Sequence, residues 1–104
     1  MRGRPIKSTI RKNIVEILYY LREGYGYQIN KIYQEIFPKV TSRSIYYHLR
    51  KGVQTKEFEV KEIRIEKGEF TWGSSVEKII YELGPQAEPK GEKRVKEYLD
   101  RIKR

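Results

Sequence analysis

One stretch of this chain gathers side chains that are suited to reading a base pair. If Ile45 and Leu49 face the core side of a helix, a rotation of about 100° per residue directs Arg43, Tyr47 and Arg50 outward. Arginine can bridge the O6 and N7 acceptors of guanine or bind a phosphate, and tyrosine can donate to a phosphate or pack on a sugar. The flanking positions of this candidate surface are Ser42, Ser44, Tyr46 and Lys51. The competing interpretation is a solvated basic face, with the tyrosines partly in the core.

The basic N-terminus offers a second candidate contact. Residues 2–5 read Arg-Gly-Arg-Pro and resemble the core of an AT-hook, in which Arg2 and Arg4 would lie in a narrow A·T minor groove. The alternative is a disordered basic tail that stays near the phosphates, and either arrangement adds electrostatic affinity. Further cations in this region that could reach a nucleic-acid backbone are Lys7, Arg11 and Lys12.

A loop expected over residues 67–75 could supply a third contact. Lys67 and Lys78 are its candidate phosphate ligands, although three neighbouring glutamates oppose a strongly basic loop. Phe70 and Trp72 either anchor the loop on the domain or touch a ligand.

The charge distribution favours binding in the first half of the chain. The 104 residues carry 23 basic and 14 acidic side chains, for a net charge of +9. Residues 1–52 account for +8 of this and residues 53–104 for only +1. An excess of this kind points to a polyanionic partner, and to nucleic acid before membrane. The many Lys and Glu residues beside few Asn and Gln resemble a thermophile's composition.

Several functions are disfavoured by what the sequence lacks. With no cysteine, one histidine and one aspartate, we expect no metal site, no catalytic residues, no cofactor and no enzymatic activity. The histidine, His48, is predicted to be a partly buried, hydrogen-bonded structural residue, with a phosphate contact as the alternative. No apolar run approaches the roughly 18 residues of a membrane span. We therefore expect a soluble, cytoplasmic, nucleoid-associated protein with no membrane partner.

The hydrophobic pattern predicts helices first and strands afterwards. A first helix begins at Ser8 or Thr9 and ends at Gly24, and a third helix is capped by Thr41 or Ser42. Aliphatic residues that alternate out of phase on either side of residues 61–62 indicate a β-bulge. The complete set of expected elements is helix 8–23, turn 24–27, helix 28–37, helix 41–55, strand 58–66, loop 67–75, strand 76–83 and helix 92–103.

This order predicts an α+β winged helix-turn-helix fold, with three helices, a two-stranded β wing and a C-terminal helix. The predicted organisation is a basic AT-hook-like tail over residues 1–7, the winged domain over 8–87, and a linker with an amphipathic helix over 88–104. Val95, Tyr98, Leu99 and Ile102 share one side of that last helix. They could pack on the first helix, form a homodimer, or dock on a partner protein.

Three segments between residues 24 and 87 resemble PadR-type regulators, in the wider group that includes MarR and ArsR regulators. They are Gly-Tyr-Gln-Ile-Asn-Lys-Ile at 26–32, Ser-Arg-Ser-Ile-Tyr-Tyr-His-Leu at 42–49, and Ile-Tyr-Glu-Leu-Gly-Pro at 80–85. The resemblance implies that the third helix enters the major groove, that Tyr46 is the family's helix-three tyrosine, and that the protein is a homodimer on inverted repeats. The last helix, of about a dozen residues, is shorter than the family's usual dimerisation region.

The leading functional hypothesis is therefore a sequence-specific protein that binds double-stranded DNA and regulates transcription. The third helix would lie in the major groove, and the tail and wing would contact the backbone or minor groove. The alternative is a winged-helix protein that binds ribosomal or transfer RNA.

Overall fold

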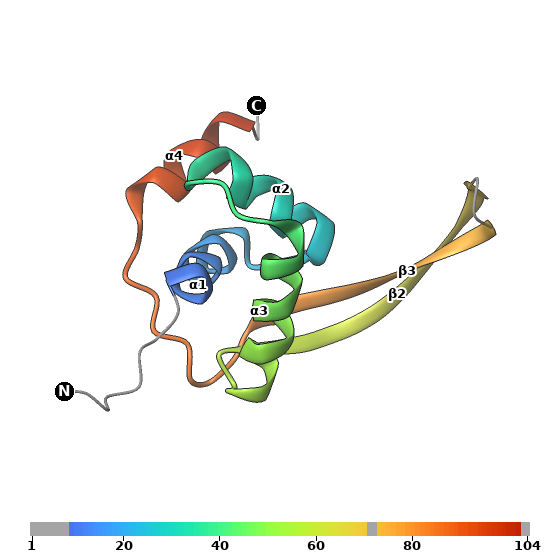
Figure 1. The fold of residues 1–104 in the computed structure, drawn as a ribbon, viewed down its shortest axis with the longest axis horizontal. Helices are drawn as coiled ribbons and strands as arrows, with labels where there is room; N and C mark the ends of the chain where they lie inside the picture. Colours follow the sequence, from blue (N-terminus) through green and yellow to red (C-terminus); the bar gives the residue numbers. More distant parts are fainter. Residues whose placement is uncertain (1–8, 71–72, 103–104) are drawn as a thin grey trace.

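The computed structural model describes residues 9–70 and 73–102. Its elements are α1 (Thr9–Leu21), β1 (Glu23–Tyr25), α2 (Gly26–Ile36), α3 (Ser42–Gln54), β2 (Phe58–Phe70), β3 (Gly73–Leu83) and α4 (Lys93–Ile102). The helices form one body, and the β2–β3 hairpin projects from it past α3 (Figure 1). The predicted helices and hairpin are confirmed, with shifts of a few residues at their ends.

The core is built around α1, whose apolar residues recur at the spacing of one helical face. Ile14, Ile17 and Leu18 are almost completely buried, as that periodicity predicts. Every other helix contributes to the same core, and so does the start of the hairpin. The buried residues from these elements include Ile29, Tyr33, Ile45, Leu49, Phe58, Val95 and Leu99.

The short segment between α1 and α2 is a strand, and the predicted turn at residues 24–27 is wrong. Glu23–Tyr25 pairs antiparallel with β3, so that Gly24 lies opposite Tyr81 in a sheet of order β1-β3-β2. A short segment that contains two glycines looks like a turn in the sequence. Here the backbone N–H and C=O groups of that segment instead pair with a strand nearly 60 residues later in the chain.

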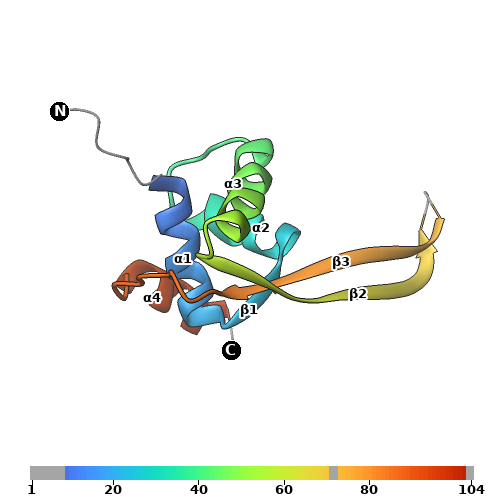
Figure 2. The ribbon, with the colours of Figure 1, turned by 90° about the horizontal axis from the view of Figure 1, so that it is seen from below.

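The hairpin is longer than the sequence predicts. Its strands continue through most of the segment expected to be a loop, because Lys67 pairs with Ser75 and Phe70 with Gly73. The loop prediction over residues 67–75 is therefore wrong, since only residues 71–72 lie between the two strands. The outer half of this ribbon stands clear of the helices and of β1 (Figure 2).

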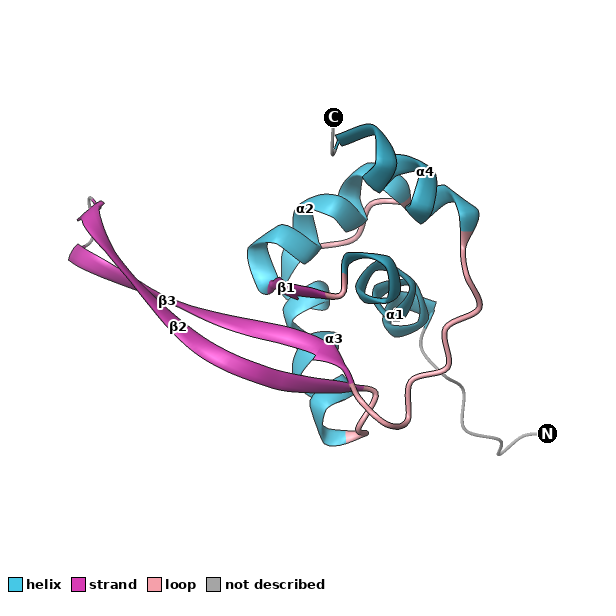
Figure 3. Cartoon of the chain, turned by 180° about the vertical axis from the view of Figure 1, so that it is seen from behind, coloured by secondary structure: helices cyan, strands magenta, loops and turns pink. Residues whose placement is uncertain are grey.

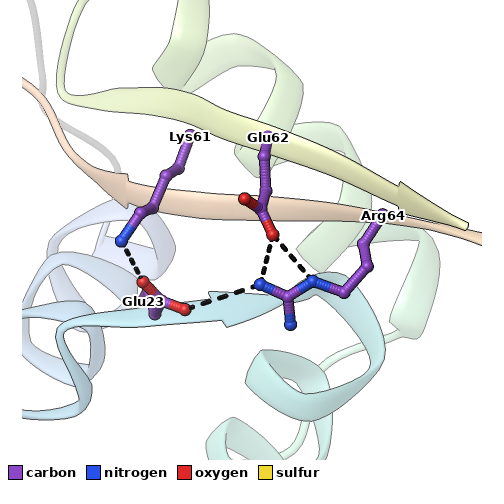
Figure 4. Close-up of polar contacts among 4 residues, drawn as sticks. All are labelled: Glu23, Lys61, Glu62 and Arg64. Atoms are coloured by element: carbon purple, nitrogen blue, oxygen red, sulfur yellow. Dashed lines mark hydrogen bonds and ion pairs between the residues drawn. The ribbon is translucent and has the colours of Figure 1, made fainter.

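The predicted β-bulge is confirmed by a shift in register between Val60 and Glu62. Lys61 and Glu62 both reach the charged face of the sheet, where Lys61 bonds to Glu23 and Arg64 bonds to Glu62 (Figure 4). The second Glu23 oxygen lies 4.0 Å from the guanidinium of Arg64. The hydrogen bond from Lys61, and then its charge, lower the pKa of Glu23. This network links β1 to β2 across the central strand.

The chain returns to α1 before it forms α4 (Figure 3). The carboxylate of Glu16, which is 8% exposed, accepts backbone N–H groups from Lys90 at 2.7 Å, Gly91 at 2.8 Å and Glu92 at 2.9 Å. These contacts hold the segment that leads into α4 against α1. Val95 and Leu99 then pack into the shared core, so α4 completes that core. Within the described residues, no helix is long and apolar enough to cross a membrane.

Candidate nucleic-acid interface

The orientation of α3 is fixed at its start and along its inner side. The side chain of Thr41 accepts the N–H of Ser44 at 3.1 Å, which confirms Thr41 as the cap. Ile45 and Leu49 are completely buried against the other helices. Because these two positions define the inner face, the rest of the helix surface is turned outward.

The outward face of α3 carries the residues that the sequence placed there. Arg43, Arg50 and Lys51 are exposed, and Tyr47 is 49% exposed. Their helical spacing gives one continuous surface with three cations and an aromatic ring. Such a surface can form hydrogen bonds with base edges, ion pairs with phosphates and apolar contacts with sugars.

The two serines of α3 take part in its N-terminal hydrogen bonds. Ser42 Oγ accepts from Asn30 Nδ2 at 3.1 Å, which ties α2 to the start of α3. Ser44 Oγ accepts from Thr41 Oγ1 at 3.1 Å. Because the amide nitrogen of Asn30 can only donate, Ser42 accepts in its bond and keeps a hydroxyl proton that it can donate to a phosphate.

Tyr46 lies at the edge of this surface, against the start of α2. A Cβ added at Gly26 would lie 2.5 Å from Cε1 of Tyr46, so only glycine admits the ring at this distance. Burial raises the pKa of Tyr46, and the neighbouring Tyr27 and Tyr25 raise it further. Tyr27 is 60% exposed beside the candidate surface, and sequence reasoning missed it. The sequence signal that could have identified Tyr27 is the repeated Gly-Tyr pair at residues 24–27.

Arg11, which the sequence predicts to contact a phosphate, is bonded to another side chain of the protein. Its Nε donates to Glu57 Oε1 at 2.8 Å, and both side chains are only 13% exposed. The same carboxylate oxygen accepts from Thr55 Oγ1 at 2.7 Å. Arg11 therefore joins α1 to the segment that connects α3 with β2.

His48 is partly buried and lies within hydrogen-bonding distance of Arg11, so the burial and the hydrogen bond predicted for it are confirmed. Its Nδ1 lies 3.3 Å from Nη1 of Arg11, and its ring meets that of Tyr47 edge-on at 5.0 Å. Burial lowers the pKa of His48, and the charge of Arg11 lowers it further. A neutral imidazole can accept a hydrogen bond from the guanidinium.

The remaining predicted contacts lie around this surface or outside the described structure. Lys12 is exposed on α1. The amine of Lys78 lies 4.2 Å from the centre of the Tyr25 ring, in a cation–π contact. Arg2, Arg4 and Lys7 fall outside the described residues, and for Lys67 the structure describes only the backbone. In the described part of the chain, no three His, Cys, Asp or Glu residues are grouped so that they could hold a metal ion.

Comparisons with known proteins bear on the fold. No protein-family model and no curated protein matches the chain. Among solved structures, the chain is similar to the crystal structure of a PadR family transcription regulator from hypervirulent Clostridium difficile R20291. The match has a TM-score of 0.55 and 20% sequence identity, and it covers 92% of this chain and 84% of that one. The expected α+β winged helix-turn-helix architecture is confirmed, and the resemblance to PadR-type regulators holds at the level of the fold.

Proposed function

We propose that this protein is a transcriptional regulator that binds double-stranded DNA through α3. The observation that carries the proposal is the exposed row of Arg43, Tyr47 and Arg50 on a helix whose inner face is locked into the core. In helix-turn-helix proteins the equivalent helix lies in the major groove, where arginine recognises guanine. The fold likeness to a PadR family regulator supports the same function.

Other basic residues would position the protein along the duplex. Lys12, Lys51 and the serines at the start of α3 are suited to phosphate contacts, and Tyr46 and Tyr27 extend the surface toward α2. The N-terminal Arg2, Arg4 and Lys7 would follow the backbone or the minor groove. Lys67 and Lys78 would contact phosphates from the β2–β3 hairpin, which is the wing of the fold. Arg11 would contribute through the position of α1, because its guanidinium is bonded to Glu57.

This role assigns the chain no enzymatic activity and no cofactor. It agrees with a cytoplasmic, nucleoid-associated protein. A homodimer through α4 has little apolar surface to use, because Val95 and Leu99 are buried in the chain's own core and Ile102 alone on that side is well exposed.

RNA binding is the second candidate, and one observation favours it. Tyr46 and Tyr47 of α3 and Tyr27 of α2 are exposed, and such rings can stack on unpaired bases. A duplex keeps its bases paired, so stacking of this kind would require single-stranded loops or ends.

Selection of bound molecules from a mixed pool of random duplex DNA and structured RNA separates the two candidates. We expect enrichment of duplex DNA with a shared sequence. Enrichment of RNA at matched salt would contradict the proposal and favour the second candidate. An Arg43→Ala, Arg50→Ala double variant serves as the control for binding through α3, and it should enrich no shared sequence.

A further inference from the structure

Two amide side chains of α2, those of Asn30 and Gln34, link the α2–α3 connection to the first residue of α3. They lie one helical turn apart, and Gln34 Nε2 donates to Asn30 Oδ1 at 3.0 Å. Asn30 Nδ2 then donates to Ser42 Oγ at 3.1 Å. Both amide side chains are partly buried, whereas Ser42 is exposed. These three side chains are called the amide relay below.

The backbone of Val40 fixes the direction of every hydrogen bond in the amide relay. Gln34 Nε2 donates to the carbonyl of Val40 at 2.7 Å, and Gln34 Oε1 accepts the N–H of Val40 at 3.2 Å. Because a carbonyl can only accept and an N–H can only donate, these two bonds allow the amide of Gln34 one orientation. The other N–H of that amide must meet the oxygen of Asn30, so the NH2 group of Asn30 faces Ser42.

This order of bonds determines what the Ser42 hydroxyl can do. The hydroxyl accepts from Asn30, so its own proton is directed away from the amide relay and can be donated to a ligand. The surrounding charge favours an anionic acceptor. Residues 24–56, which form α2, the connection and α3, hold six basic side chains and one acidic side chain.

We propose that Asn30 and Gln34 are positioning residues, which hold the Ser42 hydroxyl so that it donates to one DNA phosphate per bound chain. This inference rests on the proposed function, because the phosphate belongs to the duplex that α3 would bind. Ser42 directly precedes Arg43, so a bond from Ser42 to the backbone sets the register in which Arg43 meets the base edges. Asn30 and Gln34 act through Ser42 and not through DNA contacts of their own.

A purely structural role for the amide relay would have a different signature. Gln34 also ties the α2–α3 connection to α2, so its loss could disturb the placement of the whole of α3. Such a disturbance would weaken every contact that α3 makes with DNA. Loss of the hydroxyl's orientation would instead weaken the contact with a single phosphate, which is the effect to be measured.

A methylphosphonate scan of the duplex enriched by selection separates these two signatures. Each phosphate in turn is replaced by an uncharged methylphosphonate, and the loss of affinity relative to the native duplex is measured. For the wild type we expect a loss of about tenfold at the phosphate that Ser42 contacts, near the low end for a hydrogen bond to a charged group. In Ser42→Ala, Asn30→Ala and Gln34→Ala this loss should shrink at that phosphate and stay unchanged at the others.

Two further variants keep the test independent of folding and of overall charge. Asn30→Asp keeps the size of the side chain, but a carboxylate can only accept, so the Ser42 proton turns toward it. This variant should reproduce the phosphate pattern of Ser42→Ala with an unchanged circular dichroism spectrum. Gln54→Glu adds the same charge at an exposed position of α3 outside the amide relay, and it should keep the wild-type pattern.

An Asn30→Ala, Ser42→Ala double variant tests whether Asn30 acts through Ser42. It should bind the native duplex no more weakly than Ser42→Ala alone, because the two residues serve one contact. Weaker binding by the double variant overturns the proposal. So does a wild-type phosphate pattern in the Asn30 variants, or a loss spread evenly over all phosphates. A wild type that binds no duplex overturns the proposed function as well, whereas the other outcomes overturn this inference alone.

Discussion

Gly52 of α3 lies directly against the ring of Phe58 at the start of β2. A Cβ at position 52 would lie 2.1 Å from Cδ2 of Phe58, a distance that requires the ring or the helix to move. Phe58 is completely buried, so its ring has no free space nearby. The N–H of Glu57 also donates to the carbonyl of Gly52, at 2.9 Å. These contacts set the position at which the β2–β3 hairpin leaves α3. They therefore also set where the hairpin lies relative to the outward face of α3.

Replacing this glycine should destabilise the protein even though alanine favours helix. We expect Gly52→Ala to lower the free energy of unfolding by about 2 kcal/mol, because overpacking typically costs 1–3 kcal/mol and exceeds the gain in helix propensity of at most ~1 kcal/mol. Urea denaturation measures the change. Gln54→Ala, at an exposed position two residues later, is the matched control and should leave stability almost unchanged. Equal stability of Gly52→Ala and the wild type would show that the contact is not tight.

His48 should make stability depend on pH below neutrality. Its pKa is lower in the folded protein than its usual value of 6.5, because burial and then Arg11 disfavour the charged imidazole. The unfolded chain therefore binds more protons in this window, and stability falls as the pH drops below about 6.5 toward the folded pKa. Comparing urea midpoints at about pH 7.5 and pH 5.5, above the usual carboxylate range, measures the effect.

A His48→Gln variant isolates this contribution. Glutamine keeps a polar side chain beside Arg11 but does not titrate, so the loss of stability between the two pH values should be smaller than in the wild type. An identical loss in both proteins would show that His48 does not carry the dependence.

The helices and the candidate surface were predictable because local periodicity determines both. Ile45 and Leu49 fix the inner side of α3, and the outward positions of Arg43, Tyr47 and Arg50 follow from helical geometry alone. The bulge was predictable for a similar reason, since a change of phase in an alternating pattern is visible in the sequence.

The features that could not be predicted depend on contacts between distant residues. Glu23–Tyr25 is a strand only because β3 lies beside it, and the polar segment around residues 67–75 is paired for the same reason. Arg11 looked like a free cation because its partner, Glu57, is 46 residues away. Tyr27 is placed beside α3 by the close contact of Gly26 with Tyr46, which no local pattern reveals.

The N-terminal tail should contribute to affinity mainly through its charge. Deleting residues 1–7 removes Arg2, Arg4 and Lys7, so we expect the slope of log affinity against log salt to become shallower by roughly two to three. Fluorescence anisotropy over a salt series measures this slope. No change in slope after the deletion would show that the tail makes no phosphate contacts.

Substitution by lysine distinguishes the two interpretations of the tail. An Arg2→Lys, Arg4→Lys variant keeps the charge but loses the planar guanidinium groups. If the tail acts as an AT-hook, this variant should lose a preference for A·T-rich flanks that the wild type shows. If it is simply a basic tail, the variant and the wild type should bind all flanks alike.

The central claim is that α3 distinguishes DNA sequences, and binding to a selected duplex and to its scrambled form tests it most directly. At one fixed salt concentration, Arg43→Ala and Arg50→Ala should each reduce the ratio of these affinities by roughly 5- to 150-fold, the 1–3 kcal/mol of one bidentate contact to a base. Arg101→Ala, at an exposed arginine on α4, should leave the ratio unchanged. If both α3 variants bind the selected duplex as tightly and as selectively as the wild type, α3 does not read the sequence.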